Sequence, residues 1–264
     1  MYTHGNPFNL QGVYIIDPVI SDFTLQGDAP TYPFVVKNQK LLNLTDSEVA
    51  QIKAAADGCG LTNYVETNLL YPPKGPMVYD DAPCNGTYPE DVYLGLMDNM
   101  PCFDVYHITD TCDTYFVGNE GYFNNPELQD YIHAPHLNWE ACGPIVFPHG
   151  DRSTPPDRHG ILQRTIEKSQ RAIIANGDLD GLIMTNGTAL ALQNLFWNGD
   201  QGFKTPPTNS LIGTDGKESG SWVTERGLTF AVHTTAGHMV PEYDPSGALK
   251  SLLFLLGRVP SLGA

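Results

Sequence analysis

The chain has 264 residues, of which 14 are Lys or Arg and 30 are Asp or Glu, giving a formal net charge of −16. Such an acidic surface repels phosphate backbones and anionic lipids, so the composition disfavours nucleic acid and membrane surfaces as partners. No stretch approaches the about 18 consecutive apolar residues that a membrane-spanning helix needs. With 41% hydrophobic residues, the sequence can supply a sizeable buried core.

The predicted elements begin with a β-strand at residues 10–17, a β-branched and aromatic run that ends at Asp-Pro. Residues 45–48 (Thr-Asp-Ser-Glu) match a capping box, which predicts a helix over 48–57. The sequence from 58 to about 113 is rich in loop-forming residues and holds four of the five cysteines. We expect it to be a disulfide-tied excursion from the main sheet, followed by a short helix at 126–133.

Beyond residue 144 the sequence alternates regularly between helical and strand-like segments. The predicted elements are a helix at 161–170, a strand at 172–175, a helix at 188–197, hairpins or loops at 199–225, a strand at 228–232 and a helix at 245–256. An order of helix, buried strand, helix, strand and helix is typical of a doubly wound α/β sheet.

The five cysteines are Cys59, Cys84, Cys102, Cys112 and Cys142. They show no Cys-x-x-Cys pair and no Cys/His spacing typical of a zinc site. Their setting in Gly-, Pro- and Asp-rich sequence favours disulfides, and therefore an oxidising compartment, over five buried free thiols. Because five is an odd number, one cysteine lacks a partner within the chain.

Three Asn-x-Thr sequons, at Asn43, Asn85 and Asn186, permit glycosylation, although roughly two would arise by chance. The first residues have neither a basic nor an apolar region, so no signal peptide is predicted in this chain. Sequons and cysteines together favour a secreted or vacuolar protein.

Two segments follow predicted strands at the position where α/β sheets carry their active groups. Asn-Gly-Asp-Leu-Asp (176–180) follows the strand at 172–175, and Ala-Gly-His-Met-Val-Pro (236–241) follows the strand at 228–232. An Asp and then a His, in that order, match the last two members of an α/β-hydrolase triad, although an Asp in a turn and a His in a loop often occur in this order by chance. In such a triad a buried carboxylate orients the imidazole, which removes the proton of the nucleophile and returns it to the leaving group.

The other histidines suggest no further chemistry. His133, His136, His149 and His159 lie in or near Pro-containing segments, and their spacing is a poor match for metal ligands. His233 is expected to pack within the sheet. We therefore expect no metal and no cofactor.

Several segments, in order along the chain, carry a resemblance to a known family. They are Pro-Cys-Phe-Asp-Val-Tyr (101–106), Tyr-Phe-Asn-Asn-Pro-Glu-Leu-Gln (122–129) with His133-Ala134, Trp-Glu-Ala-Cys (139–142), Asn-Gly-Asp-Leu-Asp (176–180) and Gly-His-Met-Val-Pro (237–241). Together they resemble the serine carboxypeptidases, filamentous-fungal members above all, over about residues 10–260. The resemblance implies an α/β-hydrolase fold, of which residues 1–264 would form the C-terminal portion, with a cap or insertion at about 40–120.

Residue by residue, the resemblance implies that Asp180 is the triad acid, His238 the triad histidine and Asp178 a structural acid. Met239 would line the leaving-group side of the cleft, binding substrate. Cys142 matches a cysteine that bridges to the N-terminal half in the family. The other four cysteines would then form two bridges in one of three connectivities.

The family's nucleophile, in Gly-Glu-Ser-Tyr, has no counterpart in these 264 residues. The only substitute, Lys-Glu-Ser-Gly-Ser (217–221), lies after the Asp and without a preceding strand, so it is a poor candidate. The glycines of the oxyanion hole are absent as well.

The resemblance implies a serine-type carboxypeptidase that releases C-terminal amino acids from peptides at acid pH, with a missing N-terminal half supplying the serine. The chain alone is expected to be inactive. Two alternatives remain open: an acyltransferase of the same fold, and an inactive truncated form or pseudoenzyme.

Overall fold

The computed structural model describes residues 10–80, 82–112, 120–140 and 155–263. Its centre is a five-stranded mixed sheet with the order β1-β2-β7-β6-β5. The strands are β1 (Gly12–Ile16), β2 (Arg171–Gly177), β5 (Asn209–Ile212), β6 (Glu218–Glu225) and β7 (Leu228–His233), and a separate small ribbon pairs β3 (Phe196–Trp197) with β4 (Asp200–Gln201). The strands β1, β2 and β7 run parallel, whereas β6 and β5 are antiparallel. The predicted strands and the hairpin are confirmed.

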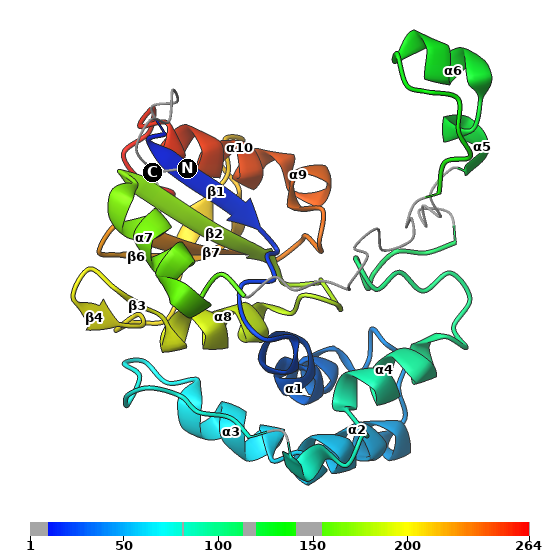
Figure 1. Cartoon of the computed structure of the whole chain (residues 1–264), viewed down its shortest axis with the longest axis vertical. Helices are drawn as coiled ribbons and strands as arrows, with labels where there is room; N and C mark the ends of the chain where they lie inside the picture. Colours follow the sequence, from blue (N-terminus) through cyan, green and yellow to red (C-terminus); the bar gives the residue numbers. More distant parts are fainter. Residues whose placement is uncertain (1–9, 81, 113–119, 141–154, 264) are drawn as a thin grey trace.

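Helices cover both faces of the sheet (Figure 1): α10 (Pro245–Leu255) lies on one side, and α7 (Ile161–Lys168) and α8 (Thr185–Asn194) lie on the other. The helix predicted at 188–197 corresponds to α8, which begins and ends three residues earlier than predicted. Its last predicted residues instead form β3, where Trp197 is fully buried.

Successive residues of the central strands pack on opposite faces of the sheet. Ile173 of β2 contributes to the core on the α10 side, with Phe254. Ile174, the next residue, contributes to the core on the other side, with Leu192 of α8. Both faces of the strand are therefore apolar, as the continuous run of buried residues in β2 requires.

A second layer of helices lies beside the sheet (Figure 1), composed of α1 (Ala29–Asn38), α2 (Asp46–Gly58), α3 (Leu61–Asn68) and α4 (Pro89–Met97). The capping box of α2 is confirmed, because the Thr45 side chain accepts from the Glu48 backbone N–H while the Glu48 carboxylate accepts from the Thr45 N–H.

The expectation of a loop-rich segment over 58–113 was wrong, because α3 and α4 lie within it. Two turn-forming residues stand at the starts of these helices. Gly60 adopts a left-handed conformation directly before α3, and Pro89 occupies the first turn of α4, where its missing N–H costs nothing. Two disulfides do cross this region, Cys59–Cys84 and Cys102–Cys112. Cys142 lies outside the described residues.

The remaining helices are short: α5 (Glu120–Phe123), α6 (Pro126–Tyr131) and α9 (Val240–Tyr243), with a π-helical turn at Thr24–Asp28 and 3₁₀ turns at Ala82–Cys84 and Arg158–Gly160. Within the described part of the chain, no helix has both the length and the apolarity to cross a bilayer.

A buried polar cluster joins β6, β7 and the start of α10. The Asp244 carboxylate accepts a hydrogen bond from His233 Nδ1 at 2.6 Å, one from the Ser219 hydroxyl at 3.0 Å and one from the Gly247 N–H at 2.9 Å. The prediction that His233 packs within the sheet is confirmed, since it is fully buried. Burial raises the pKa of Asp244, but the hydrogen bonds from His233 and Gly247 outweigh it and leave that pKa below its usual value.

Replacing Asp244 with Asn is expected to lower the free energy of unfolding by about 1–3 kcal/mol at pH 7, because buried donors lose a charged acceptor. A carboxyl group with a lowered folded-state pKa stabilises the fold above its unfolded pKa, and this contribution disappears as the pH falls through the folded value. The difference from wild type should therefore shrink below about pH 4. Urea unfolding at pH 7 and pH 3.5 measures the difference in free energy of unfolding between wild type and Asp244→Asn, with exposed Asp98→Asn as the control. The same difference at both pH values would contradict a lowered pKa of Asp244.

Candidate active site

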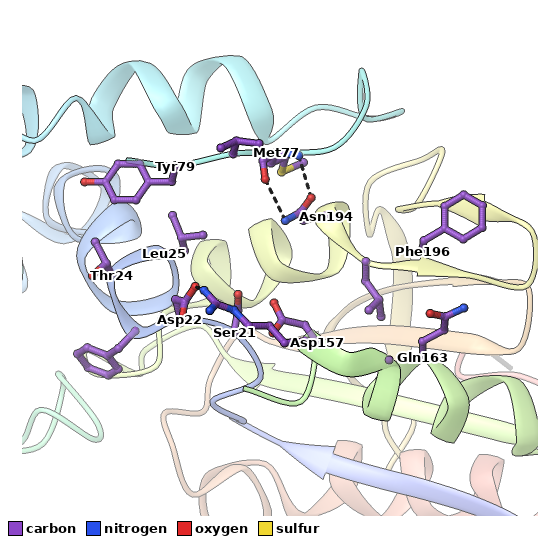
Figure 2. Close-up of a pocket in the computed structure, with 15 residues that line it drawn as sticks. Ser21, Asp22, Thr24, Leu25, Met77, Tyr79, Asp157, Gln163, Asn194 and Phe196 are labelled. Atoms are coloured by element: carbon purple, nitrogen blue, oxygen red, sulfur yellow. Dashed lines mark hydrogen bonds and ion pairs between the residues drawn. The ribbon is translucent and has the colours of Figure 1, made fainter. Parts of the chain in front are cut away.

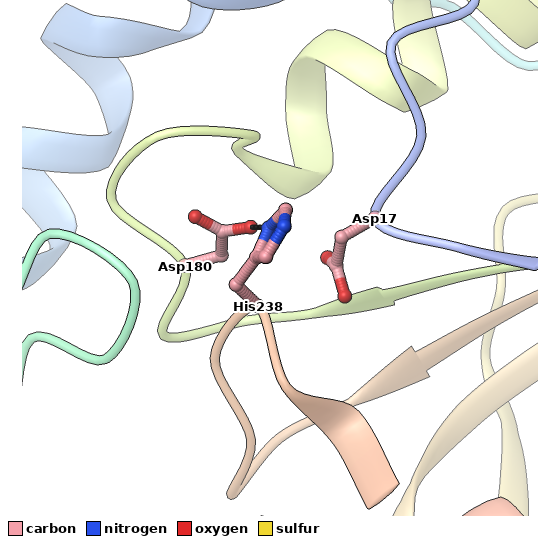
Figure 3. A group of neighbouring side chains, drawn as sticks. All are labelled: Asp17, Asp180 and His238. Carbon is pink, nitrogen blue, oxygen red and sulfur yellow. Dashed lines mark hydrogen bonds and ion pairs between the residues drawn. The ribbon is translucent and has the colours of Figure 1, made fainter. Parts of the chain in front are cut away.

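An acid and an imidazole meet at the carboxyl ends of two neighbouring strands (Figure 3). Nδ1 of His238 lies 2.8 Å from Oδ2 of Asp180, although 58 residues separate the two in sequence. The Asp180 side chain is fully buried, whereas 31% of the His238 side chain is exposed. The acid is thus shielded from water while the imidazole remains accessible.

The loops that carry these residues pass very close to each other. The Leu179 N–H donates to the Ala236 carbonyl at 2.9 Å. A Cβ atom on Gly177 would lie 2.0 Å from the Gly237 carbonyl oxygen, so only glycine fits at this crossing. The glycines of the two sequence motifs therefore bring the acid and the imidazole within hydrogen-bonding distance.

The Asp180 carboxylate is held by its own loop. Its Oδ1 accepts from the backbone N–H groups of Leu182 at 2.8 Å and Ile183 at 3.0 Å. These two donors fix the orientation of the carboxylate and leave Oδ2 for His238. His238 therefore donates through Nδ1–H, and its Nε2 is the nitrogen available to accept a proton.

The pKa of His238 is raised above its ordinary value. The hydrogen bond to Asp180 is the largest cause, and the negative charge of that carboxylate adds to it, while burial acts in the opposite direction. Asp180 thus stabilises the imidazolium, which is the state a general base reaches after taking a proton.

A second acid, Asp17, lies beside the pair (Figure 3). Its Oδ1 accepts from Asn176 Nδ2 at 3.0 Å and from the Gly177 N–H at 2.9 Å, whereas its buried Oδ2 has no partner among the described residues. Burial, and then the charge of Asp180, raise the pKa of Asp17 to about 9.

The sequence analysis missed Asp17, because an Asp-Pro pair after a strand predicts only a turn. Its position at the carboxyl end of a parallel strand was a signal that could have identified it.

One atom each of Asp17, Asp180 and His238 lies within 4.8 Å of the others, so these three residues could in geometry hold a small cation. The hydrogen bonds described above already use both Asp180 oxygens and the His238 Nδ1.

The other predicted site residues that the structure describes form no hydrogen bond with the pair. Met239 follows His238 directly and is 53% exposed. Asp178 pairs with Lys37 of α1, which links its turn to the helical layer. The Ser219 hydroxyl donates to Asp244 and belongs to the buried cluster described above. Within the described parts of the chain, no hydroxyl or thiol group is hydrogen-bonded to Nε2 of His238.

Two of the three sequon asparagines are accessible. Asn43 and Asn85 are exposed, whereas Asn186 lies within α8 and is only partly exposed. Glycosylation is therefore sterically straightforward at the first two.

A cavity of about 770 Å³ lies apart from the acid–imidazole pair, between α7, α8 and the turn that precedes α1 (Figure 2). Asn194 forms two hydrogen bonds with the Met77 backbone at its upper wall. Phe23, Val78 and Phe196 line it with large apolar side chains that are exposed.

The parallel strands and the pair at their carboxyl ends have the geometry of the acid and base in hydrolases that act through a nucleophile on an α/β sheet. Comparison with known proteins defines the family. The family described as Peptidase_S10, serine carboxypeptidase, matches residues 2–256, and the chain belongs to it. The resemblance noted in the sequence is confirmed.

Among curated relatives, a "Carboxypeptidase Y homolog" of Arthroderma benhamiae is 34% identical and matches 97% of this chain but 54% of its own length. A "Serine-type carboxypeptidase F" of Aspergillus niger is 32% identical, with 97% and 56% covered. The chain therefore spans about half the length of these relatives. The solved structure of a prohormone-processing carboxypeptidase of Saccharomyces cerevisiae matches 99% of the chain with a TM-score of 0.66 and 18% identity, which shows a shared fold.

Proposed function

We propose that this chain is the C-terminal part of an α/β-hydrolase-fold serine carboxypeptidase and contributes its general base, His238, and the orienting acid, Asp180. The observation that carries the proposal is the 2.8 Å hydrogen bond between them, made by a buried acid and an accessible imidazole. Nε2 of His238 takes the proton of a serine hydroxyl that lies outside these 264 residues, and that serine attacks the terminal peptide bond. The imidazolium then protonates the leaving amino acid, and water releases the acyl group with His238 again as base.

The open edge of the sheet supports a nucleophile from outside. Within the described residues, β1 pairs with β2 on one side and with no strand on the other. A further parallel strand there would end at the same edge as Asp180 and His238, where strand–turn–helix elbows carry nucleophiles. The exposed apolar side chains around the cavity, Phe23, Val78 and Phe196, give the upstream part a surface to cover.

The substrate class in this proposal is the free C-terminus of peptides, with Met239 beside the leaving residue. The family and the printed names of the relatives, which are carboxypeptidases, support it. The two disulfides support passage through the secretory pathway, with Asn43 and Asn85 as glycan acceptors.

The pH dependence should follow His238. Because the pKa of His238 is raised, its neutral, base-competent form appears at higher pH than in a free histidine. We expect kcat/KM of the complete enzyme to rise with pH through this pKa, which runs against the acid optimum that the family resemblance implies. The pH profile of kcat/KM, measured with a neutral blocked dipeptide as substrate, tests this expectation. A profile already flat from pH 4 upward would contradict the role of His238 as base.

The proposal is tested by joining this chain to an upstream part that carries the nucleophile. The N-terminal half of a full-length fungal relative is fused to residues 10–264, and release of the C-terminal amino acid from a blocked dipeptide is measured. We expect release by the fusion and none by the chain alone or by a fusion with the nucleophilic serine replaced by Ala. Release by the chain alone would overturn the site assignment, and a folded but inactive fusion would overturn the function.

A further inference from the structure

The segment between Cys102 and Cys112 forms a short closed loop next to the active-site pair. A disulfide joins its ends, with the two Cα atoms 5.0 Å apart. Inside the loop, the Tyr106 N–H donates to Asp104 Oδ1 at 2.8 Å and the Asp110 N–H donates to the His107 carbonyl at 2.9 Å. The loop is thus closed and internally tied. We call residues 103–111 the strap.

The strap is bonded to the loop that carries the acid. The Gly181 N–H donates to the Val105 carbonyl at 2.8 Å, and the Ile108 N–H donates to the Leu179 carbonyl at 3.1 Å. Residues 179 and 181 are the immediate neighbours of Asp180. Two backbone hydrogen bonds therefore fix the chain on both sides of the catalytic acid.

The same strap is bonded to His238. The backbone N–H of His238 donates to the Tyr106 carbonyl at 2.7 Å, and the rings of these two residues lie 5.3 Å apart. The fit is close, because a Cβ on Gly237 would lie 2.0 Å from the Tyr106 carbonyl oxygen. The acid and the base, which come from different loops, thus share one neighbouring segment.

A buried side-chain cluster anchors the strap to the segment after His238. The His107 ring stacks on the Tyr243 ring with centroids 3.6 Å apart. Asp110 accepts from the Tyr243 hydroxyl at 2.6 Å through Oδ2 and lies 3.0 Å from His107 Nδ1 through Oδ1. The His107 and Asp110 side chains are each only 7% exposed. Two of the three side chains of this anchor are therefore buried, and the anchor ties the strap to α9.

We propose that the strap, residues 103–111 closed by the Cys102–Cys112 disulfide, is a positioning element that holds Asp180 and His238 in their hydrogen-bonded geometry. Two side chains on separate loops keep a catalytic distance only if the supporting residues are themselves fixed. The strap hydrogen-bonds to the backbone of both loops that carry the pair, and its Tyr106 ring lies beside the His238 ring. The inference rests on the proposed function for its catalytic meaning, but the hydrogen bond itself is observable in the chain alone.

The test compares the two disulfides of the isolated chain. One variant carries Cys102→Ser and Cys112→Ser; the control carries Cys59→Ser and Cys84→Ser, which removes a disulfide from the helical layer. The readouts are the low-field NMR signal of His238 Nδ1–H and the pKa of His238. In the first variant we expect the signal to be lost and the pKa to fall towards that of a free histidine. The control variant should keep the Nδ1–H signal and the raised pKa. The same signal and the same pKa of His238 in the two variants would overturn the proposal.

A second variant tests the positioning role of the strap if the variant without the Cys102–Cys112 disulfide does not fold. Tyr243→Phe removes only the hydroxyl bond to Asp110 and keeps the ring stack; exposed Tyr131→Phe is its control. We expect faster exchange of the His238 Nδ1 proton with water in Tyr243→Phe and no change in Tyr131→Phe. An unchanged exchange rate of the His238 Nδ1 proton in folded Tyr243→Phe would contradict the proposed positioning role of the strap.

In the fused, complete enzyme, opening the strap should lower kcat by about 100-fold with little change in KM, the cost expected for a misplacement of about 1 Å. An inactive wild-type fusion would defeat the proposed function while leaving the NMR result on the strap intact. The two failures are therefore distinguishable.

Discussion

Replacing Asp180 with Asn in the fused, complete enzyme is expected to lower kcat on the order of 10⁴-fold with little effect on folding. The reason lies in the two backbone donors to Oδ1, from Leu182 and Ile183. They require an acceptor, so an Asn side chain would place its oxygen there and turn its NH₂ group towards His238. His238 Nδ1 must then accept, and its proton moves to Nε2. In that tautomer Nε2 cannot take the proton of the serine.

The measurement combines single-turnover kinetics with nitrogen NMR of the His238 ring. The matched control is Asp178→Asn, two residues away in the same turn, whose carboxylate pairs with the exposed Lys37. It should retain most of the activity. Near-wild-type activity in folded Asp180→Asn, or a retained Nδ1–H tautomer, would show that Asp180 does not orient the base.

Replacing Asp17 with Asn is expected to flatten the pH dependence of stability between pH 5 and pH 8. The pKa of Asp17 is raised to about 9 by burial and by the nearby charge of Asp180. Over this range the unfolded chain has lost the proton while the native state keeps it, so the native state binds more protons and becomes less stable as the pH rises. The contribution of one such group is about 1.4 kcal/mol per pH unit. Asn carries no ionisable proton, so this slope disappears.

Urea unfolding at several pH values measures this slope directly. If the Asn amide destabilises the fold, for example through an unpaired N–H, it lowers the free energy of unfolding equally at every pH. Such a cost does not change the slope of stability with pH. Exposed Asp98→Asn serves as control and should keep the wild-type slope. Equal slopes in Asp17→Asn and wild type would mean that Asp17 is ionised in the folded protein.

The two predictions assign different tasks to two neighbouring carboxyl groups. Asp180 has donors for both oxygens, whereas Asp17 has donors for one oxygen and leaves the other buried without a partner. Two acids this close in a buried site do not both carry charge readily. The charge of Asp180 is therefore one of the causes that raise the pKa of Asp17.

Local patterns in the sequence predicted the elements that carry the site. The strand at 172–175 and the strand at 228–232 are evident from their apolar runs, and the structure extends each by only a few residues. The capping box at 45–48 likewise predicted the start of α2, because its two residues are only three positions apart in the sequence. The two segments that carry the acid and the imidazole were identified because each follows a strand, and the family resemblance then singled out Asp180 and His238 within them.

Local patterns misled where turn-forming residues begin helices. Gly60 and Pro89 are residues typical of turns, yet Gly60 directly precedes α3 and Pro89 is the first residue of α4. Helix α1 was missed because it contains Pro33. Isolated helices of this length are marginally stable, and burial of their apolar faces in the tertiary structure stabilises them.

The sequence by itself determined the family motifs, the order of the main α/β elements and the two residues that form the acid–imidazole pair. Only the tertiary structure decided the pairing of the four described cysteines, the place of Asp17 beside that pair and the strap that bonds to both loops carrying the pair. The physical reason is distance along the chain. Asp17 meets Gly177 across 160 residues because β1 and β2 pair in register, and a hydrophobic pattern specifies each strand but not its neighbour.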